Sequence, residues 1–134
     1  MIEELVNLNE LYQSADWKKE KHVPMVEIVG EIKKGLTISL RLQVGKEIEH
    51  PNTTEHHIEW IQALFLPEDE KFPFIIGRTE FNAHGASING PNSSTVYCDP
   101  TTTLTFKTEI PGIIIALSSC NIHGLWRNTQ EIKF

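Results

Sequence analysis

One stretch of the chain, from His50 to His57, holds three of the six histidines of the protein. Its composition is typical of a loop, and Pro51 favours an extended conformation for the residue before it. Neutral imidazole is the commonest metal ligand that side chains supply, so histidines crowded between rigid strands indicate a metal site. Neighbouring histidines on a surface loop are also often only solvated, and this stretch alone leaves both interpretations open.

A second candidate is the segment Cys120-Asn121-Ile122-His123, which places a thiol and an imidazole three residues apart. In a tight loop both side chains can reach one metal ion. The pair alone also fits a structural cysteine that precedes a surface histidine. A further histidine, His22, lies in the charged segment from Asp16 to Pro24, which is typical of an exposed loop.

These donors would meet if the chain folded as an antiparallel β-sandwich, because the loops of such a fold cluster at its two ends. The set would comprise His22, His50, His56, Cys120 and His123. A structural zinc needs only four ligands, and a blue copper site takes two histidines, one cysteine and a weak axial ligand. A square of imidazoles with an axial thiolate suits iron instead, and it leaves a sixth position at which a small oxidant binds.

The elements that must position these loops have the patterns of short β-strands. Residues 36–44 alternate apolar and polar side chains with a period of two, as expected of a strand with one buried face. Residues 113–117 form a continuous apolar run rich in β-branched side chains, typical of a central strand buried on both faces. Further strands are predicted over residues 25–32, 58–66, 74–81, 95–98, 101–110 and 125–134, with a short helix left open for 58–66.

This pattern predicts an all-β fold, an immunoglobulin-like antiparallel β-sandwich or barrel of seven to eight strands. Apolar residues over 2–16 recur at roughly helical spacing, so a short N-terminal helix or extension is predicted before the strands. The chain of 134 residues suits one core and holds no visible linker or repeat, which favours a single domain over residues 1–134.

The charge, the apolar content and the cysteine count of the chain exclude several classes of protein. The formal net charge of −6 argues against a nucleic-acid-binding protein, which would carry a basic face. No apolar run approaches the length of a transmembrane helix, and the N-terminus lacks the features of a signal peptide, so we expect a cytoplasmic protein. Two cysteines, Cys98 and Cys120, do not make a disulfide framework, and the absence of a Cys-x-x-Cys pair excludes a four-cysteine iron site within the chain.

Several segments resemble those of the superoxide reductase family, which comprises neelaredoxin and the iron domain of desulfoferrodoxin. They are Glu20-Lys21-His22-Val23-Pro24, the stretch from Gly45 to His57, and Cys120-Asn121-Ile122-His123-Gly124-Leu125-Trp126. The segments from Phe81 to Gly85 and from Asn89 to Asn92 are also similar. The resemblance covers nearly the whole chain from Trp17 onward, and the lack of a four-cysteine domain makes the chain similar to the one-iron class.

The resemblance implies a mononuclear iron that cycles between Fe2+ and Fe3+ and has four equatorial histidines and one axial cysteine. By motif the equatorial ligands are His22, His50, His56 and His123, and the axial ligand is Cys120.

Two charged residues and two further histidines complete the implied site. Glu20 takes the sixth position in the ferric resting state, Lys21 lies near the open face, and both are expected to act in catalysis. His57 and His84 match family positions that are not ligands. We interpret His57 as a supporting or sheet residue and His84 as a residue that forms hydrogen bonds within a loop.

The implied activity is that of a superoxide reductase, an oxidoreductase that reduces superoxide by one electron to hydrogen peroxide and so detoxifies oxygen. The implied partners are superoxide as substrate, a rubredoxin-like electron donor and further copies of the chain, in a homotetramer or another homo-oligomer. Neither nucleic acid nor a membrane is an expected partner. Three alternatives stay open at this point: an iron electron-transfer protein, a superoxide dismutase, and a binding module built on the same fold.

Overall fold

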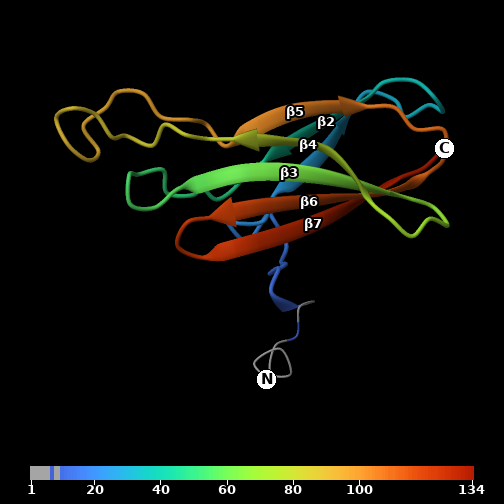
Figure 1. The fold of residues 1–134 in the computed structure, drawn as a ribbon, viewed down its shortest axis with the longest axis horizontal. Coiled ribbons are helices and arrows are strands. Elements are labelled where there is room, and N and C mark those ends of the chain that lie inside the picture. The colour runs from blue at the N-terminus through green and yellow to red at the C-terminus, as the bar shows by residue number, and fades with distance from the viewer. Residues whose placement is uncertain (1–6, 8–9) are drawn as a thin grey trace.

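Two antiparallel β-sheets lie face to face and form the body of the protein (Figure 1). The computed structural model describes residue 7 and residues 10–134. Within these residues, one sheet has the strand order β1-β2-β5, with β1 Met25–Val29, β2 Ile38–Gln43 and β5 Thr101–Phe106. The other has the order β4-β3-β6-β7, with β3 Ile58–Pro67, β4 Phe74–Glu80, β6 Gly112–Cys120 and β7 Gly124–Ile132. The predicted all-β, immunoglobulin-like class is confirmed.

Most predicted strands form; β3 and β6 are longer than predicted and the others are shorter. Residues 58–66 lie in strand β3 rather than in the alternative short helix. The apolar run at 113–117 lies in β6, which is paired on both sides, with β3 and with β7. Residues 95–98 do not form a strand, because Tyr97 makes only an isolated bridge with His84 in the long connection between β4 and β5.

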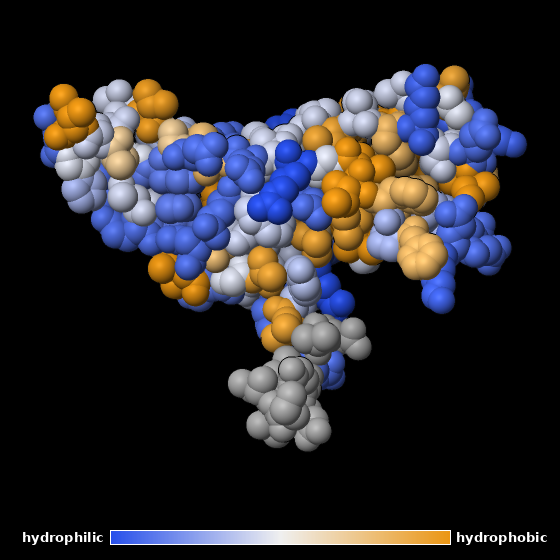
Figure 2. All heavy atoms as spheres, viewed as in Figure 1, coloured by the Kyte–Doolittle hydropathy of each residue, from blue (hydrophilic) through white to orange (hydrophobic). Residues whose placement is uncertain are grey.

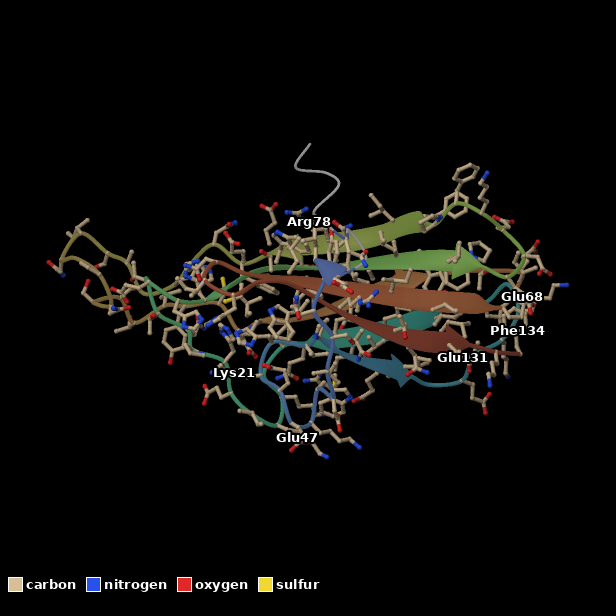
Figure 3. All side chains as sticks on the ribbon, turned by 90° about the horizontal axis from the view of Figure 1, so that it is seen from below. Lys21, Glu47, Glu68, Arg78, Glu131 and Phe134 are labelled. Atoms are coloured by element: carbon tan, nitrogen blue, oxygen red, sulfur yellow. The ribbon has the colours of Figure 1, made fainter. Side chains whose placement is uncertain are left out.

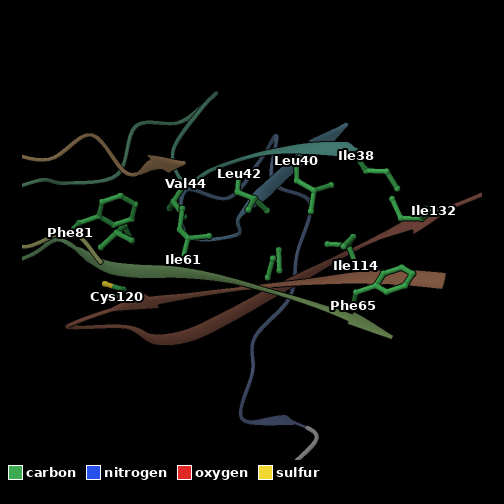
Figure 4. Close-up of a cluster of buried hydrophobic side chains, with 13 residues drawn as sticks. Ile38, Leu40, Leu42, Val44, Ile61, Phe65, Phe81, Ile114, Cys120 and Ile132 are labelled. Atoms are coloured by element: carbon green, nitrogen blue, oxygen red, sulfur yellow. The ribbon is translucent and has the colours of Figure 1, made fainter. Parts of the chain in front are cut away.

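The hydrophobic core fills the space between the two sheets. In β2 the side chains of Ile38, Leu40 and Leu42 are completely or almost completely buried, and those of the residues between them are not, as the period of two predicts. They face β3 and β6, which contribute Ile61 and Ile114 among other apolar side chains (Figure 4). Each fully buried aliphatic side chain of this size stabilises the fold by about 1.5–3 kcal/mol.

The register of the strands gathers four connecting segments at one end of the sandwich. Met25 at the start of β1 lies opposite Gln43 at the end of β2, and Gln43 lies opposite Thr101 at the start of β5. In the other sheet, Ile58 at the start of β3 lies opposite Cys120 at the end of β6. This end therefore receives the segments 16–24, 44–57, 81–100 and 121–123, which include every histidine of the chain.

Part of the helix predicted over residues 2–16 lies outside the described residues, and the described residues 10–16 form no α-helix. In the described part, Gln13 makes an isolated parallel bridge with Trp126 at the start of β7. The backbone N–H of Gln13 donates to the carbonyl of Leu125 (3.0 Å), and the N–H of Arg127 donates to the carbonyl of Gln13 (2.8 Å). No helix in the described residues is long and apolar enough to cross a membrane.

The opposite end of the sandwich carries a cleft with an apolar lining. Leu66, Pro111, Ile113 and Phe134 line it, together with a few charged residues at its rim. Figure 2 shows apolar side chains gathered at this end, near the C-terminus. The two ends of the fold therefore differ in kind, since one gathers imidazoles and the other gathers apolar surface.

Replacing Leu40 by Ala is expected to lower the free energy of unfolding by about 2–5 kcal/mol, because it leaves a cavity at a side chain with no exposed surface. Leu36→Ala is the matched control, since Leu36 precedes the same strand and is 56% exposed. Its effect should stay within about 0.5 kcal/mol. Urea denaturation of both variants measures the difference, and similar losses in the two would contradict the assignment of the core.

Candidate metal centre

Metal-binding side chains from three separate segments meet at the loop-rich end of the sandwich. One potential ligand atom each from His22, His56, Cys120 and His123 lies within 4.8 Å of the others. His50 joins them, since its ring centroid lies 4.8 Å from that of His22 and 4.8 Å from that of His56. The structure therefore brings together the five donors that the sequence predicts to converge.

Strand pairing places the cysteine and the neighbouring loops. Cys120 is the last residue of β6 and lies opposite Ile58 on one side and Gly124 on the other. Gly124 has a φ of +78°, a left-handed conformation that closes the short turn between β6 and β7. The loop that carries His56 ends directly before Ile58, so it lies beside this turn. On the other flank, the hydroxyl of Ser118 donates to the carbonyl of His22 (2.9 Å).

The outer nitrogens of two histidines are engaged by oxygen acceptors. Nδ1 of His22 lies 2.7 Å from Oε1 of Glu20, and Nδ1 of His50 lies 2.6 Å from the carbonyl oxygen of Pro51. Each acceptor holds the proton of its ring on Nδ1, which leaves Nε2 as a free lone pair. Metal-binding histidines commonly have a partner of this kind, since it fixes the tautomer and the direction of the ring.

The inner nitrogens of the cluster face one another without enough hydrogen-bond donors among them. Nε2 of His50 is fully buried and has no hydrogen-bond partner. Nδ1 of His123 lies 3.2 Å from Nε2 of His22, 3.3 Å from Nε2 of His56 and 3.8 Å from Sγ of Cys120. One ring nitrogen can share a single proton with only one of these atoms. A cation would satisfy all of them together, so the donor set fits a metal ion.

Burial favours the neutral form of the imidazoles, which is the form that can bind a metal. It lowers the pKa of His50 to about 4, although the hydrogen bond to Pro51 acts in the opposite direction. Burial is also the largest cause of the lowered pKa values of His22 and His56. The positive charge of Lys21 contributes to all three shifts in the same direction.

Glu20 and Lys21 flank the cluster on its solvent side. Oε1 of Glu20 accepts hydrogen bonds from the backbone N–H (2.9 Å) and from Nδ1 (2.7 Å) of His22, so the carboxylate lies on the outer edge of that ring. The pKa of Glu20 is lowered: burial raises it, and the hydrogen bonds and charge of His22 outweigh that effect. Lys21, His22 and Ile48 line a small hollow with Glu20. Figure 3 shows Lys21 far from Glu131 and Phe134 at the other end.

The remaining histidines form a separate pair. The rings of His57 and His84 stack in parallel, with centroids 3.5 Å apart and an interplanar angle of 6°. Nδ1 of His57 donates to the carbonyl of Thr53 (2.9 Å), and Nε2 of His84 donates to the carbonyl of Phe81 (2.5 Å). His84 thus forms hydrogen bonds within its loop, as the sequence predicts, and both rings brace the loops behind the cluster.

One contact in the centre involves a side chain to which sequence reasoning gave no role. The indole of Trp126 stacks on the ring of His22, with centroids 4.7 Å apart and an angle of 11°, and its Nε1 donates to the carbonyl of His123 (3.2 Å). The available signal was its position two residues after Gly124, in a strand that had to pair with the strand that ends at Cys120.

Gly45 has a φ of +82°, and a Cβ built on it would lie 2.8 Å from the backbone nitrogen of His50. Gly45→Ala is therefore expected to displace His50 and to weaken metal retention by about 10-fold, in addition to a conformational cost of about 1–3 kcal/mol. Gly30→Ala is the control, because Gly30 has a φ of +84° and nothing within 4 Å of its Cβ position. Metal content after dialysis against a chelator measures the effect, and equal retention in the two variants would contradict it.

Comparisons with known proteins agree with this geometry. A family model described as Desulfoferrodoxin matches residues 14–129. A superoxide reductase from Pyrococcus furiosus is 54% identical over 94% of this chain and 99% of its own length, and a neelaredoxin from Megalodesulfovibrio gigas is 46% identical over 92% and 95%. The solved structure of a reduced superoxide reductase (neelaredoxin) from Archaeoglobus fulgidus superposes with a TM-score of 0.87, at 53% identity, over 92% of this chain and 99% of that one. The protein belongs to the desulfoferrodoxin family, as the motifs of its sequence predict.

Proposed function

We propose that the protein is a superoxide reductase, which reduces superoxide with one electron and two protons to hydrogen peroxide at a mononuclear, non-haem iron. The iron ligands are His22, His50, His56, His123 and Cys120. The observation that carries the proposal is the convergence of these five donors, with Nε2 of His50 buried and without a hydrogen-bond partner. A relative at 54% identity that bears the name superoxide reductase supports the same activity.

Iron is the metal that this donor set suits, since one thiolate and several imidazoles bind it while leaving a position for a small ligand. When bound, it supplies the single electron that superoxide accepts. Because each turnover consumes one electron, an external reductant must return it. We propose a rubredoxin-like protein in this role, and the exposed Ile122 beside Cys120 and His123 supports access for such a donor at this end.

Cys120 is held in a form suited to metal binding. Its side chain is almost fully buried, and the backbone N–H of His123 donates to its Sγ at 3.3 Å. This hydrogen bond holds Sγ of Cys120 beside the ring of His123. The sulfur lies at the buried side of the cluster, and the hollow lined by Glu20, Lys21 and His22 offers a solvent-facing side for the substrate.

Lys21 attracts the substrate anion to that open side. The chain has a net charge of −6, which on average repels superoxide, so a positive charge beside the site is needed to draw it in. Lys21 lines the same hollow as Glu20 and His22, and its charge is felt by three of the proposed ligands.

Glu20 has two roles in the proposal. In the structure its carboxylate orients His22 through Nδ1, on the side away from the cluster. Its proposed second role is to bind the oxidised metal at the sixth position, for which it must leave the ring of His22. Glu20 precedes His22 by two residues, so both roles fall to one side chain next to a proposed ligand.

Assembly and compartment complete the proposal. We propose a single domain over residues 1–134 that assembles into a homotetramer, and the exposed Phe72, Phe74 and Ile75 at the edge strand β4 support contacts between copies. The cytoplasm is the proposed compartment, because Cys98 and Cys120 are unpaired and a metal-binding thiol must stay reduced.

Metal analysis and kinetics on the full chain test the function. We expect one iron per chain, a blue oxidised form, and rapid oxidation of the reduced protein by superoxide, with sustained turnover only when an electron donor is supplied. A colourless, metal-free protein would identify a binding module. Iron without rapid oxidation by superoxide would identify an electron carrier, and sustained consumption of superoxide without a donor would identify a dismutase.

Cys120→Ser should abolish the thiolate-to-iron absorption band of the oxidised protein, because a hydroxyl oxygen replaces the sulfur that gives rise to it. Cys98→Ser serves as the control, since Cys98 is half-buried against the core and is not one of the clustered donors. Visible absorption spectra of the iron-loaded variants give the result. Persistence of the band in Cys120→Ser, or its loss in Cys98→Ser, would show that the axial ligand is wrongly assigned.

Lys21→Ala should lower the second-order rate constant for oxidation by superoxide by a factor of up to about 10 and flatten its dependence on ionic strength. Lys33→Ala is the matched control, since it removes the same charge at the far end of the sandwich, where Lys33 is paired with Glu31. Pulse radiolysis at several salt concentrations measures both. A rate and slope in Lys21→Ala equal to those of the control would remove Lys21 from the mechanism.

A further inference from the structure

The side chain of Asn121 joins the two loops that carry the proposed ligands. It lies between Cys120 and His123, yet both ends of its amide point to the histidine loop. Its Oδ1 accepts a hydrogen bond from the backbone N–H of His57 (2.9 Å), and its Nδ2 donates to the carbonyl of Glu55 (2.9 Å). The backbone N–H of Asn121 donates to the carbonyl of His57 at 3.2 Å.

These hydrogen bonds lie on both sides of His56 in the sequence. Among the rings of His22, His50 and His56, that of His56 is the least constrained. His22 and His50 are each held at Nδ1, by Glu20 and by Pro51. Within the described part of the chain, Nδ1 of His56 has no such partner, and this ring is also less buried than the other two. The direction of the His56 side chain must therefore come from its backbone.

We propose that Asn121 is a positioning residue, whose amide sets the place of His56 relative to Cys120 and His123. The inference rests on the proposed iron site. The amide fits in only one orientation, because its donor meets a carbonyl and its acceptor meets an N–H. Thr53 also bonds the backbone of His56, but it belongs to the same loop and cannot fix that loop against the Cys120 turn. Asn121 supplies this second reference point.

Asn92 offers a matched comparison, because it holds the same loop from the other side. Its Oδ1 accepts from the backbone N–H of Thr54 (2.8 Å), and its Nδ2 donates to the carboxylate of Glu55 (2.9 and 3.0 Å). None of these hydrogen bonds connects the histidine loop to the turn that carries Cys120. Asn92 has a φ of +55°, so glycine is the substitution that removes the side chain without adding backbone strain.

The test measures how fast the iron-loaded full chain loses its metal to an excess of chelator. Asn121→Ala is expected to lose iron about 10-fold faster, in the range typical of lost partners behind a metal ligand, and to shift the thiolate-to-iron absorption band. Asn121→Asp keeps the acceptor for His57 and loses the donor for Glu55, so it should be intermediate, and it carries the test if the alanine variant does not fold. Asn92→Gly should change the rate less than about twofold.

The possible results distinguish a failure of the role proposed for Asn121 from a failure of the proposed superoxide reductase function. Iron loss and absorption in Asn121→Ala like those of the unsubstituted protein would overturn the positioning role and leave the proposed function intact. Equal acceleration in Asn121→Ala and Asn92→Gly would also overturn it, because Asn121 would then only stabilise the loop. An unsubstituted protein that holds no iron would overturn the proposed function and the inference together.

Discussion

The pairing of β3 with β6 is the constraint on which the metal centre depends. It sets Ile58 opposite Cys120, and the hydrogen bond from Asn121 to His57 continues the ladder one step beyond the strands. A slip of one residue in this register would turn Cys120 away from the interior and move His56 relative to the turn. Most of the ladder is held far from the site, where β3 and β6 bury Ile61, Ala63, Ile114 and Ala116 in the core. An irregularity between Ile58 and Trp60 then shifts the register before it reaches Cys120.

The donor set of the centre would destabilise the fold if no cation bound it. A buried nitrogen without a partner and several lone pairs directed at one another are unfavourable in a protein interior. The apolar core between the sheets offsets this cost, and the two regions share only a boundary, at Cys120 and Val44. Because the core supplies the stability of the fold, the side chains of the site can keep an arrangement that favours metal binding.

The parts of the fold and the site that the sequence predicts are those whose signal is local. The alternation over residues 36–44 reveals β2 because burial on one face imposes a period of two, and imidazoles and a thiol reveal the donors because few other side chains bind metals. The strand predicted over residues 95–98 is wrong, since these residues belong to a loop held by an isolated bridge.

The parts that sequence reasoning did not reach arise from contacts between distant segments. Trp126 and Ser118 act on His22 from about a hundred residues away, and Asn121 reaches a loop more than sixty residues earlier. The types of these residues do not indicate which distant residue each of them contacts. The position of Glu20 on the outer edge of His22 is likewise a matter of geometry, since a carboxylate two residues away could face either nitrogen of the ring.

The bridge between Gln13 and Trp126 has a consequence for how copies of the chain can meet. β7 is an edge strand, and an edge strand offers unpaired backbone groups to any strand of another molecule. Gln13 already uses the outward backbone groups of Leu125 and Arg127, at the end of the edge beside the metal centre. Continuation of the sheet into a neighbouring molecule is blocked there as long as Gln13 stays in place. The N-terminal segment therefore acts as a stop that keeps the neighbourhood of the open face clear of intermolecular strand pairing.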